Sequence, residues 1–378
     1  MRNLIKPTIA AICSCILLFS GAVAAQSKGP PSDEWKALLQ EAANLFFEGK
    51  FDGGVVVAKK ALELAERERG PNHPSVAASL NRLAELYRAL GQFSAAEPLY
   101  RRALAIREGA RNPDRPGLGQ ALNNLAHLYM AQGEYAAAEP LFKRALENRE
   151  AAHGAEHPDV ATTLNGLADL YREQGKFAQA EPLFKRSLAI REKIMAPGAQ
   201  TGLSVNQAAS SVNQLSFSLI GLASIYREQA KYEEAETLYK RAIAVIDDSR
   251  DRDHPLMARP LSGLASLFVR RGEHGSAEVL YKRAIAILEN SLDRDHPRMA
   301  SALQGLADVY SARDGNVAAE ALLKRALEIR VAALGGQHPS VAATLEKLAA
   351  VYAKQNKSAE AKQFADRAAA IRSAAPRK

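Results

Sequence analysis

Apolar residues recur along this chain at helical spacing. Around residue 84 they fall at positions i, i+3, i+4 and i+7, which is one face of a helix; they are Leu80, Leu83, Ala84 and Tyr87. Gly91 interrupts the pattern, as expected after a helix end. A second apolar face follows, made of Phe93, Ala96, Leu99, Tyr100, Ala103 and Leu104. The pattern therefore predicts two helices joined by a short turn, each with one apolar side.

The same helix pair is repeated along the chain. The aromatic residue that ends the first apolar face recurs as Tyr87, Tyr129, Tyr171, Tyr226, Phe268, Tyr310 and Tyr352. Every step is 42 residues except one of 55, from Tyr171 to Tyr226, and a weaker copy begins near Ser32. A hairpin with one apolar side cannot bury it alone, so successive copies must stack. We therefore predict an all-α solenoid of about eight stacked helical hairpins.

The longer step carries thirteen additional residues, at about 197–212. A helical stripe still runs through the end of this stretch, as Ala208, Val212, Leu215, Leu219, Leu222 and Tyr226. We expect the first helix of the fifth hairpin to start early, near Ser204, after a loop around 197–202. The alternative is a disordered insert.

His-Pro pairs mark the predicted starts of several hairpins. They are His73-Pro74, His157-Pro158, His254-Pro255, His296-Pro297 and His338-Pro339. Proline suits the first helical position, because its ring presets φ and its missing N–H would lack a partner there anyway. Since metal binding needs several ligands and these histidines come one to a hairpin, we interpret them as loop residues before helix starts. No metal site and no cofactor are expected.

Each second helix carries an acid four residues before a base. The pairs are Glu97–Arg101, Glu139–Lys143, Glu181–Lys185, Glu236–Lys240, Glu278–Lys282 and Glu320–Lys324. This order is the favourable one for a helical ion pair, at about 0.2–0.5 kcal/mol each. The conspicuous Lys-Arg doublets are therefore interpreted as a solvated helix face, and no nucleic-acid partner is expected. Aromatic residues that would stack on bases instead occupy packing positions.

The first 25 residues differ from the rest. They have Arg2 and Lys6 in front, an apolar run, and small residues at 22–25. This layout is typical of a secretory signal peptide, with cleavage expected near Ala24 or Ala25 and a periplasmic or secreted mature chain. The alternative is an uncleaved N-terminal anchor. Both cysteines lie in this segment, so we expect the mature chain to be stable without disulfides.

The spacing of Leu80, Leu83, Ala84, Tyr87, Ala96, Tyr100 and Ala103 resembles the tetratricopeptide repeat, TPR. The 42-residue period and the words LNNLAHLY, AEPLFKRAL and HPDVA are similar to the longer repeats of kinesin light chains. The resemblance implies a right-handed superhelix whose first helices line a concave groove that binds peptides. The expected repeats are at about 33–72, 74–114, 116–156, 158–197, 204–253, 255–295, 297–337 and 339–374, after a signal peptide at 1–25 and a linker at 26–32, and before a tail at 375–378.

Groove positions on the first helices are 78, 81, 82, 85, 88 and 89 and their repeats. The predicted peptide-binding residues are Asn81, Arg82, Arg88, Asn123, Asn124, His127, Asn165, Asp169, Arg172 and Arg227. Three asparagines at one register form a ladder that would pair with a peptide backbone, because an amide offers both a donor and an acceptor. The arginines add a basic edge suited to a carboxylate. Copies five to seven carry Gly221, Gly263 and Gly305 and should form a flatter, less charged stretch that could accept a bulkier partner.

Catalytic constellations are missing from the sequence: it has no Gly-rich phosphate loop, no HExxH and no nucleophile elbow. The resulting expectation is a non-enzymatic scaffold that binds a peptide or partner protein in its groove. The alternatives are an assembly factor that self-associates and a regulatory subunit of an envelope complex. The sequence does not name the partner.

Overall fold

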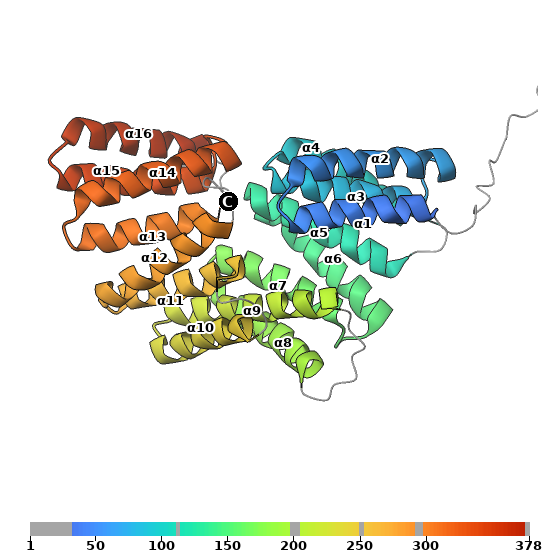
Figure 1. Cartoon of the computed structure of the whole chain (residues 1–378), viewed down its shortest axis with the longest axis horizontal. Helices are drawn as coiled ribbons and strands as arrows, with labels where there is room; N and C mark the ends of the chain where they lie inside the picture. The colour runs from blue at the N-terminus through green and yellow to red at the C-terminus, as the bar shows by residue number, and fades with distance from the viewer. Residues whose placement is uncertain (1–31, 111–113, 197–204, 249–252, 292–297, 375–378) are drawn as a thin grey trace, which may run out of the picture.

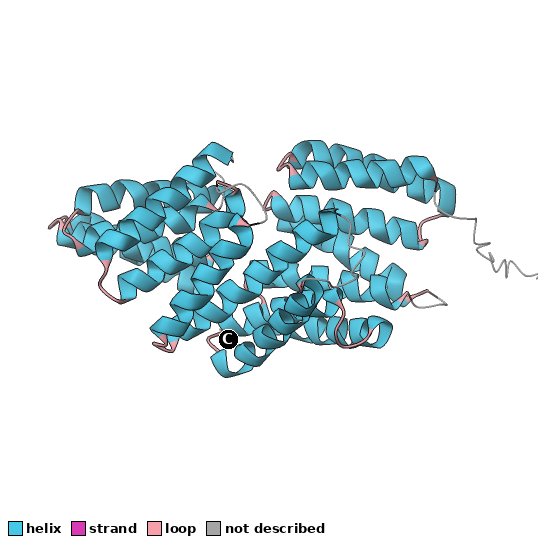
Figure 2. Ribbon diagram, turned by 60° about the horizontal axis from the view of Figure 1, so that its bottom comes forward, coloured by secondary structure: helices cyan, strands magenta, loops and turns pink. Residues whose placement is uncertain are grey.

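The computed structural model describes residues 32–110, 114–196, 205–248, 253–291 and 298–374. The expected signal peptide, the loop around 197–202, the His296-Pro297 pair and the C-terminal tail lie outside these residues. Within them the secondary structure is entirely helical (Figure 2). No helix of the described residues is long and apolar enough to cross a membrane.

The helices form successive antiparallel pairs, as predicted (Figure 1). The first helices of the pairs are α1 (Asp33–Phe47), α3 (Pro74–Ala89), α5 (Arg115–Gln132), α7 (Pro158–Glu173), α9 (Val205–Glu228), α11 (Ala258–Arg270), α13 (Met299–Ala312) and α15 (Pro339–Lys354). The second helices are α2 (Phe51–Arg69), α4 (Phe93–Glu108), α6 (Tyr135–His153), α8 (Phe177–Met195), α10 (Tyr232–Asp247), α12 (His274–Ser291), α14 (Asn316–Leu334) and α16 (Ser358–Ala374). A short 3-10 turn, η1 (Pro255–Met257), precedes α11.

Helix starts follow the signals in the sequence. His73, His157, His254 and His338 each cap the following helix, because their Nδ1 accepts the backbone N–H two residues on. This confirms the interpretation of these four histidines as residues before helix starts. The helix α9 begins at Val205, one residue after the expected start, and runs for 24 residues. The additional residues therefore lengthen a helix in part.

The hairpins stack into a right-handed superhelix, and the first helices form its inner wall. Successive first helices contact one another, α7 with α9 and α11 with α13 for example, whereas second helices mainly contact their own partner and the next first helix. Elements on the inside of a curved stack lie closer together than those on the outside. The first helices therefore line the concave face, as the resemblance implied.

Small and aromatic residues interlock between the layers. Ala84, Ala126 and Ala168 are fully buried, which lets the two helices of a hairpin approach closely. Gly221 lies against the Phe184 ring of the preceding hairpin; a Cβ there would come within 2.4 Å of the ring. Gly166, Gly263 and Gly305 stand in the same way against Phe142, Tyr239 and Tyr281. The missing side chains of Gly221, Gly263 and Gly305, which the sequence singled out for a flatter groove, therefore also make room for these rings.

A three-residue clasp joins successive repeats on the outer side. Glu139 forms the expected ion pair with Lys143, at 2.7 Å, and also accepts a hydrogen bond from the Tyr171 hydroxyl of the next repeat, at 2.9 Å. The other five predicted ion pairs are likewise present, at 2.7 to 2.8 Å. Tyrosine hydroxyls reach the same glutamates at Tyr129, Tyr226, Tyr310 and Tyr352. The ion pairs therefore also connect the repeats.

The ends of the stack are finished differently. At the start, the Trp35 indole donates a hydrogen bond to the Ser79 hydroxyl at 2.8 Å and packs beside Val76, which covers the first interface as a cap. At the end, α16 is exposed along most of its length and buries Ala368 and Ile371.

Candidate functional site

The asparagine ladder is present at one register but does not lie in an open groove. Asn81, Asn123 and Asn165 are 4%, 4% and 2% exposed. Asn165 Oδ1 accepts a hydrogen bond from the Ser218 hydroxyl of α9 at 2.9 Å, so this amide joins two first helices. The expectation of a freely offered amide ladder is corrected here, because the curvature of the stack brings successive first helices over this position.

Two of these asparagines nevertheless have a side-chain oxygen without a hydrogen-bond donor in the described residues. The side-chain oxygens of Asn81 and Asn123 are buried and accept no hydrogen bond from any described residue. A buried polar atom without a partner has a free-energy cost of about 1–3 kcal/mol. These two positions remain candidates for a contact that the isolated chain does not make.

The other predicted residues of repeats two and three are partly engaged with one another. Arg82 donates to Glu85 at 2.6 Å, and Asn124 of the next repeat donates to the same carboxylate at 3.1 Å. His127 packs edge-on against the Phe142 ring, with centroids 4.9 Å apart. Burial, and to a lesser extent the charge of Arg88, lowers the pKa of His127 to about 4. This imidazole is therefore uncharged at neutral pH and serves packing.

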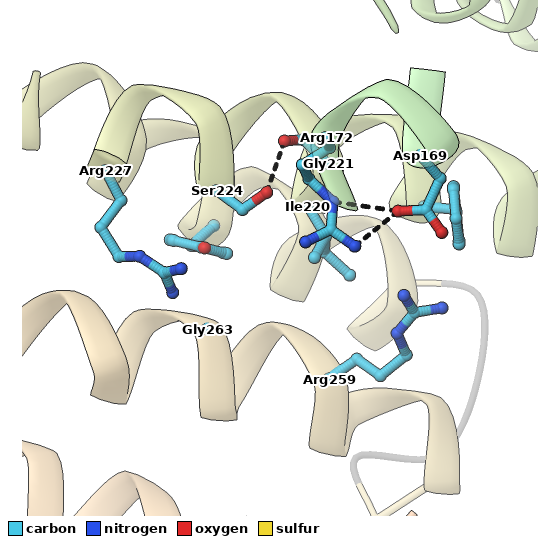
Figure 3. Close-up of a pocket in the computed structure, with 10 residues that line it drawn as sticks. Asp169, Arg172, Ile220, Gly221, Ser224, Arg227, Arg259 and Gly263 are labelled. Atoms are coloured by element: carbon cyan, nitrogen blue, oxygen red, sulfur yellow. Dashed lines mark hydrogen bonds and ion pairs between the residues drawn. The ribbon is translucent and has the colours of Figure 1, made fainter. Parts of the chain in front are cut away.

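A hollow opens on the inner wall of repeats four to six (Figure 3). Its volume is about 170 Å³, and we call it the arginine pocket. It is lined by Asp169 and Arg172 of α7, Phe217, Ile220, Gly221, Ser224 and Arg227 of α9, Tyr239 of α10, and Arg259 and Gly263 of α11. Three of the predicted site residues, Asp169, Arg172 and Arg227, thus meet in one hollow, whereas the asparagines do not line it.

Arg259 differs from the other two arginines of the arginine pocket in its contacts. Its guanidinium carbon lies 4.7 Å from the centre of the Phe217 ring, a cation–π distance. Among the described residues it forms no ion pair. The side chain is exposed to solvent, yet burial in the inner wall lowers its pKa; the carboxylate of Asp169 opposes this shift, and the charges of Arg172 and Arg298 add to it. The positive charge is therefore partly desolvated and not neutralised.

The other two arginines already have acidic neighbours. Arg172 donates to Asp169 through Nε and Nη2, at 2.9 and 2.6 Å, and to Glu173. Arg227 pairs with Glu228 at 2.8 Å and donates to the Ser266 hydroxyl of α11. Within the pocket lining the balance is three arginines to one aspartate. The arrangement can accept an anionic group, with Arg259 as the first contact.

A second hollow adjoins the arginine pocket across Ile220 and Arg259, which line both. Its volume is about 360 Å³. It is lined by Ile220, Pro255, Ala258, Arg259, Ser262, Leu288, Arg298, Ser301 and Ala302. The two hollows together form a trough over repeats four to seven, with an apolar floor and arginines at intervals. Two arginines of this trough, Arg259 and Arg298, lie in the stretch of copies five to seven that was expected to be less charged.

Sequence reasoning missed Arg259 and Phe217, although a signal was present. Both residues stand at the repeats of position 78, one of the six groove positions, since 78 recurs as 120, 162, 217, 259 and 301. The groove positions could not have identified Tyr239, because this residue belongs to a second helix and reaches the hollow beneath Gly263.

A sequence profile described as the tetratricopeptide repeat matches residues 36–109, 117–193, 215–290, 277–330 and 298–374. No curated protein sequence matches the chain.

Similar solved structures share the fold at low sequence identity. The nearly identical TPR-like repeats of a kinesin light chain from Podosopora anserina are 23% identical, with a TM-score of 0.44, and cover 58% of this chain and 99% of that one. A Rap protein complexed with Competence and Sporulation Factor is 13% identical, with a TM-score of 0.60, over 90% of this chain and 98% of that one. The apo form of the quorum sensor NprR from B. thuringiensis is 15% identical, with a TM-score of 0.58, over 89% and 87%.

Proposed function

Because the chain belongs to the tetratricopeptide-repeat family, we propose that it is a non-enzymatic scaffold that binds an extended peptide, or an extended segment of a partner protein, along its inner wall. The observation that carries the proposal is Arg259, a cation on the inner wall that forms no ion pair in the described residues, with Asp169 the one acidic residue lining the same pocket. A carboxylate of the ligand would occupy the arginine pocket. The fold alone does not choose a ligand, since repeat scaffolds of one shape serve many partners.

The proposed contact has a defined chemistry. A guanidinium held flat over an aromatic ring keeps its edge free, and that edge donates two parallel hydrogen bonds to a carboxylate. Ser224 offers a hydroxyl in the same hollow, although it now donates to the Gly221 carbonyl at 2.7 Å. The neighbouring hollow would take an apolar side chain against Ile220 and Leu288. The predicted ligand thus presents an acidic residue or a C-terminal carboxylate next to an apolar residue.

One fold relative was solved as a complex, a Rap protein complexed with Competence and Sporulation Factor. The likeness is one of fold, so the ligand proposed for this chain depends on the arginine pocket. The buried, unpartnered oxygens of Asn81 and Asn123 support a longer contact surface that extends into repeats two and three.

Selection from a random dodecapeptide display library, with the untagged chain from residue 26 as bait, tests the proposal. We expect the enriched peptides to carry Asp, Glu or a free C-terminal carboxylate beside an apolar residue. Synthetic versions should bind Arg259→Ala at least about tenfold more weakly, which corresponds to about 1.4 kcal/mol. Replacing the peptide acid with its amide should give a similar loss.

Arg144→Ala is the matched control, because Arg144 is an exposed arginine on the second helix α6, paired with Glu108. This variant should bind as tightly as the parent chain. Equal affinities of the parent chain and Arg259→Ala, or indifference to the acid-to-amide change, would contradict the proposal.

A further inference from the structure

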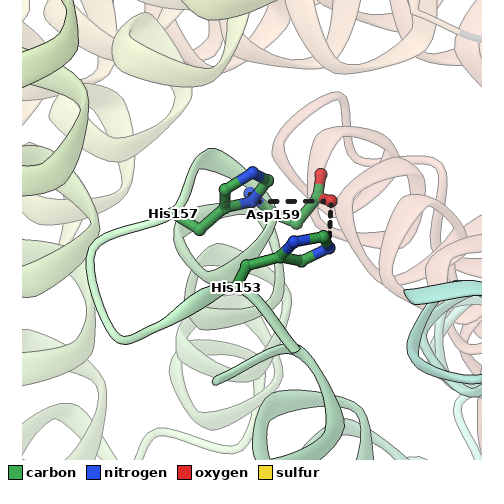
Figure 4. Close-up of side chains that lie close together, drawn as sticks. All are labelled: His153, His157 and Asp159. Atoms are coloured by element: carbon green, nitrogen blue, oxygen red, sulfur yellow. Dashed lines mark hydrogen bonds and ion pairs between the residues drawn. The ribbon is translucent and has the colours of Figure 1, made fainter. Parts of the chain in front are cut away.

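A second polar cluster lies apart from the arginine pocket, where the third repeat passes into the fourth (Figure 4). His153 is the last residue of α6, His157 caps α7, and Asp159 is the second residue of α7. Figure 4 shows the two imidazoles and the carboxylate converging from the two sides of the connecting loop.

The separations in this cluster are those of metal ligands more than of hydrogen bonds. One ligand atom from each of the three side chains lies within 4.8 Å of the other two. His153 Nε2 and His157 Nδ1 are 3.8 and 3.6 Å from Asp159 Oδ2. Those distances exceed a hydrogen bond, whereas ligands at about 2.0–2.1 Å from a tetrahedral ion stand roughly 3.3 Å apart. Closing the site requires the two imidazoles to turn until a nitrogen of each faces the ion, because their planes are now nearly parallel.

The Asp159 carboxylate is not engaged by a nearby arginine. Arg149 donates to the Asp159 main-chain carbonyl and to the Thr163 hydroxyl, at 2.8 and 2.7 Å. In the described part of the chain, the basic groups within 4.0 Å of the carboxylate are the two imidazoles, which are charged only when protonated, while Arg149 and Arg191 act on it from further away. The imidazole rings of His153 and His157 are stacked, with centroids 4.0 Å apart and planes 15° apart. His157 is held by its cap of α7, whereas in the described part of the chain no hydrogen bond holds the Asp159 carboxylate or the His153 imidazole.

His157 differs in this respect from the other capping histidines. His153 precedes it by four residues, whereas the residues four before His73, His254 and His338 are Arg69, Arg250 and Leu334. The interpretation of these histidines as coming singly therefore does not hold at His157.

We propose that His153, His157 and Asp159 bind one Zn²⁺ ion, with water completing the coordination. Two imidazoles and one carboxylate suit zinc, whereas Mg²⁺ and Ca²⁺ prefer oxygen ligands throughout. His157 Nδ1 now accepts the Asp159 N–H at 3.2 Å, so binding through this nitrogen would replace the helix cap. The ion would clip the end of α6 to the start of α7 and hold the junction of two repeats.

Zinc titration of the untagged chain from residue 26, followed by equilibrium dialysis and by Co²⁺ absorption as a spectroscopic substitute, tests this site. We expect one equivalent to bind, with tetrahedral Co²⁺ absorption in the visible that Zn²⁺ abolishes and Mg²⁺ does not. His153→Ala and Asp159→Asn should each weaken Zn²⁺ binding at least tenfold. Hydrogen exchange of the amides around 153–160 should slow when Zn²⁺ is added.

His73→Ala is the matched control, because His73 caps α3 in the same way and has no second histidine. Its Zn²⁺ affinity should equal that of the parent chain, while circular dichroism checks that each variant is folded. Unchanged affinity in His153→Ala, or an equal loss in His73→Ala, would overturn the proposal. So would displacement of Zn²⁺ by millimolar Mg²⁺.

Discussion

The imidazole Nε2 of His338 lies 3.2 Å from the carbonyl oxygen of Ala131, a residue 207 positions earlier in the chain. Since His338 Nδ1 accepts the Ser340 N–H, Nε2 carries the proton of the neutral ring and donates to Ala131. The start of the eighth repeat thus meets the end of α5, as the proximity of the red and teal helices in Figure 1 shows. The superhelix therefore closes on itself after about one turn.

Removing this imidazole should open the ring. In His338→Ala the cross-ring hydrogen bond is lost, at a cost of about 0.5–1.5 kcal/mol, and the radius of gyration measured by small-angle X-ray scattering should rise. His73→Ala loses the same kind of helix cap without a cross-ring contact and should leave the radius unchanged. An identical scattering curve for His338→Ala and the parent chain would show that this bond does not hold the ring.

Gly91 provides an independent test of closure. It has φ +73°, and a Cβ on it would lie 2.2 Å from the Ala333 carbonyl oxygen of α14. Gly133 occupies the equivalent turn with φ +80° and has nothing within 4 Å of its Cβ position. Both alanine variants should lose about 1 kcal/mol from the left-handed backbone alone, but only Gly91→Ala should also expand in scattering. Equal radii for the two variants would contradict the closed ring.

The hydroxyl of the outer clasp should contribute measurably to stability. Tyr171→Phe removes the 2.9 Å bond to Glu139 and should lower the free energy of unfolding by about 1 kcal/mol. Tyr232→Phe is the control, because no described residue bonds to its hydroxyl. Urea unfolding followed by circular dichroism measures both. A loss in Tyr232→Phe as large as that in Tyr171→Phe would assign the effect to general packing.

Acid should loosen the same clasps. The hydrogen bond from Lys324, with further donation from Tyr352, lowers the pKa of Glu320 to about 2, below its value of about 4.3 in an unfolded chain. Between these values the unfolded state binds more protons, so stability is complete above about pH 4.3 and falls as the pH approaches 2. Thermal melting between pH 7 and pH 2 should show this loss.

Glu320→Gln should reduce the acid-dependent part of that loss, because the titrating group is removed. A hydrogen bond from the lysine four residues on also lowers the pKa of four other clasp residues, Glu139, Glu181, Glu236 and Glu278. A single variant therefore removes only part of the acid-dependent loss of stability. Glu63→Gln, at a site without an ion pair in the described residues, should leave the pH profile unchanged. If the parent chain, Glu320→Gln and Glu63→Gln have the same pH profile, the clasps do not cause the acid-dependent loss of stability.

Much of the fold could be predicted because it depends on short-range patterns. The apolar faces around Leu80 and Tyr100 and the glycine between them decide where helices form and which sides must be buried. The repeat then requires each hairpin to stack on the next, since its apolar side has no other partner. The ion pair of Glu139 and Lys143 was equally readable, because four residues along a helix bring two side chains together.

The site was predictable only in part, because it depends on the curvature of the whole stack. Asp169, Arg172 and Arg227 were chosen for their positions, and they do line one hollow. Asn81, Asn123 and Asn165 were chosen in the same way, but they are buried, because the inner wall is tightly closed at their position in the repeat. Arg259 acquires its character from forming no ion pair in the described residues and from lying over Phe217, which no local pattern specifies.

By itself the sequence determined the helices, their pairing and their order, since these follow from contacts between residues at most about one repeat apart. The gathering of His153, His157 and Asp159 depends on the path of the short loop between α6 and α7, which the helix pattern does not specify. The tertiary structure alone decided the closure of His338 on Ala131 and the meeting of three arginines in one hollow. The physical reason is that a small rotation at each interface between repeats accumulates over the stack. Distances across the stack are therefore properties of the assembled solenoid.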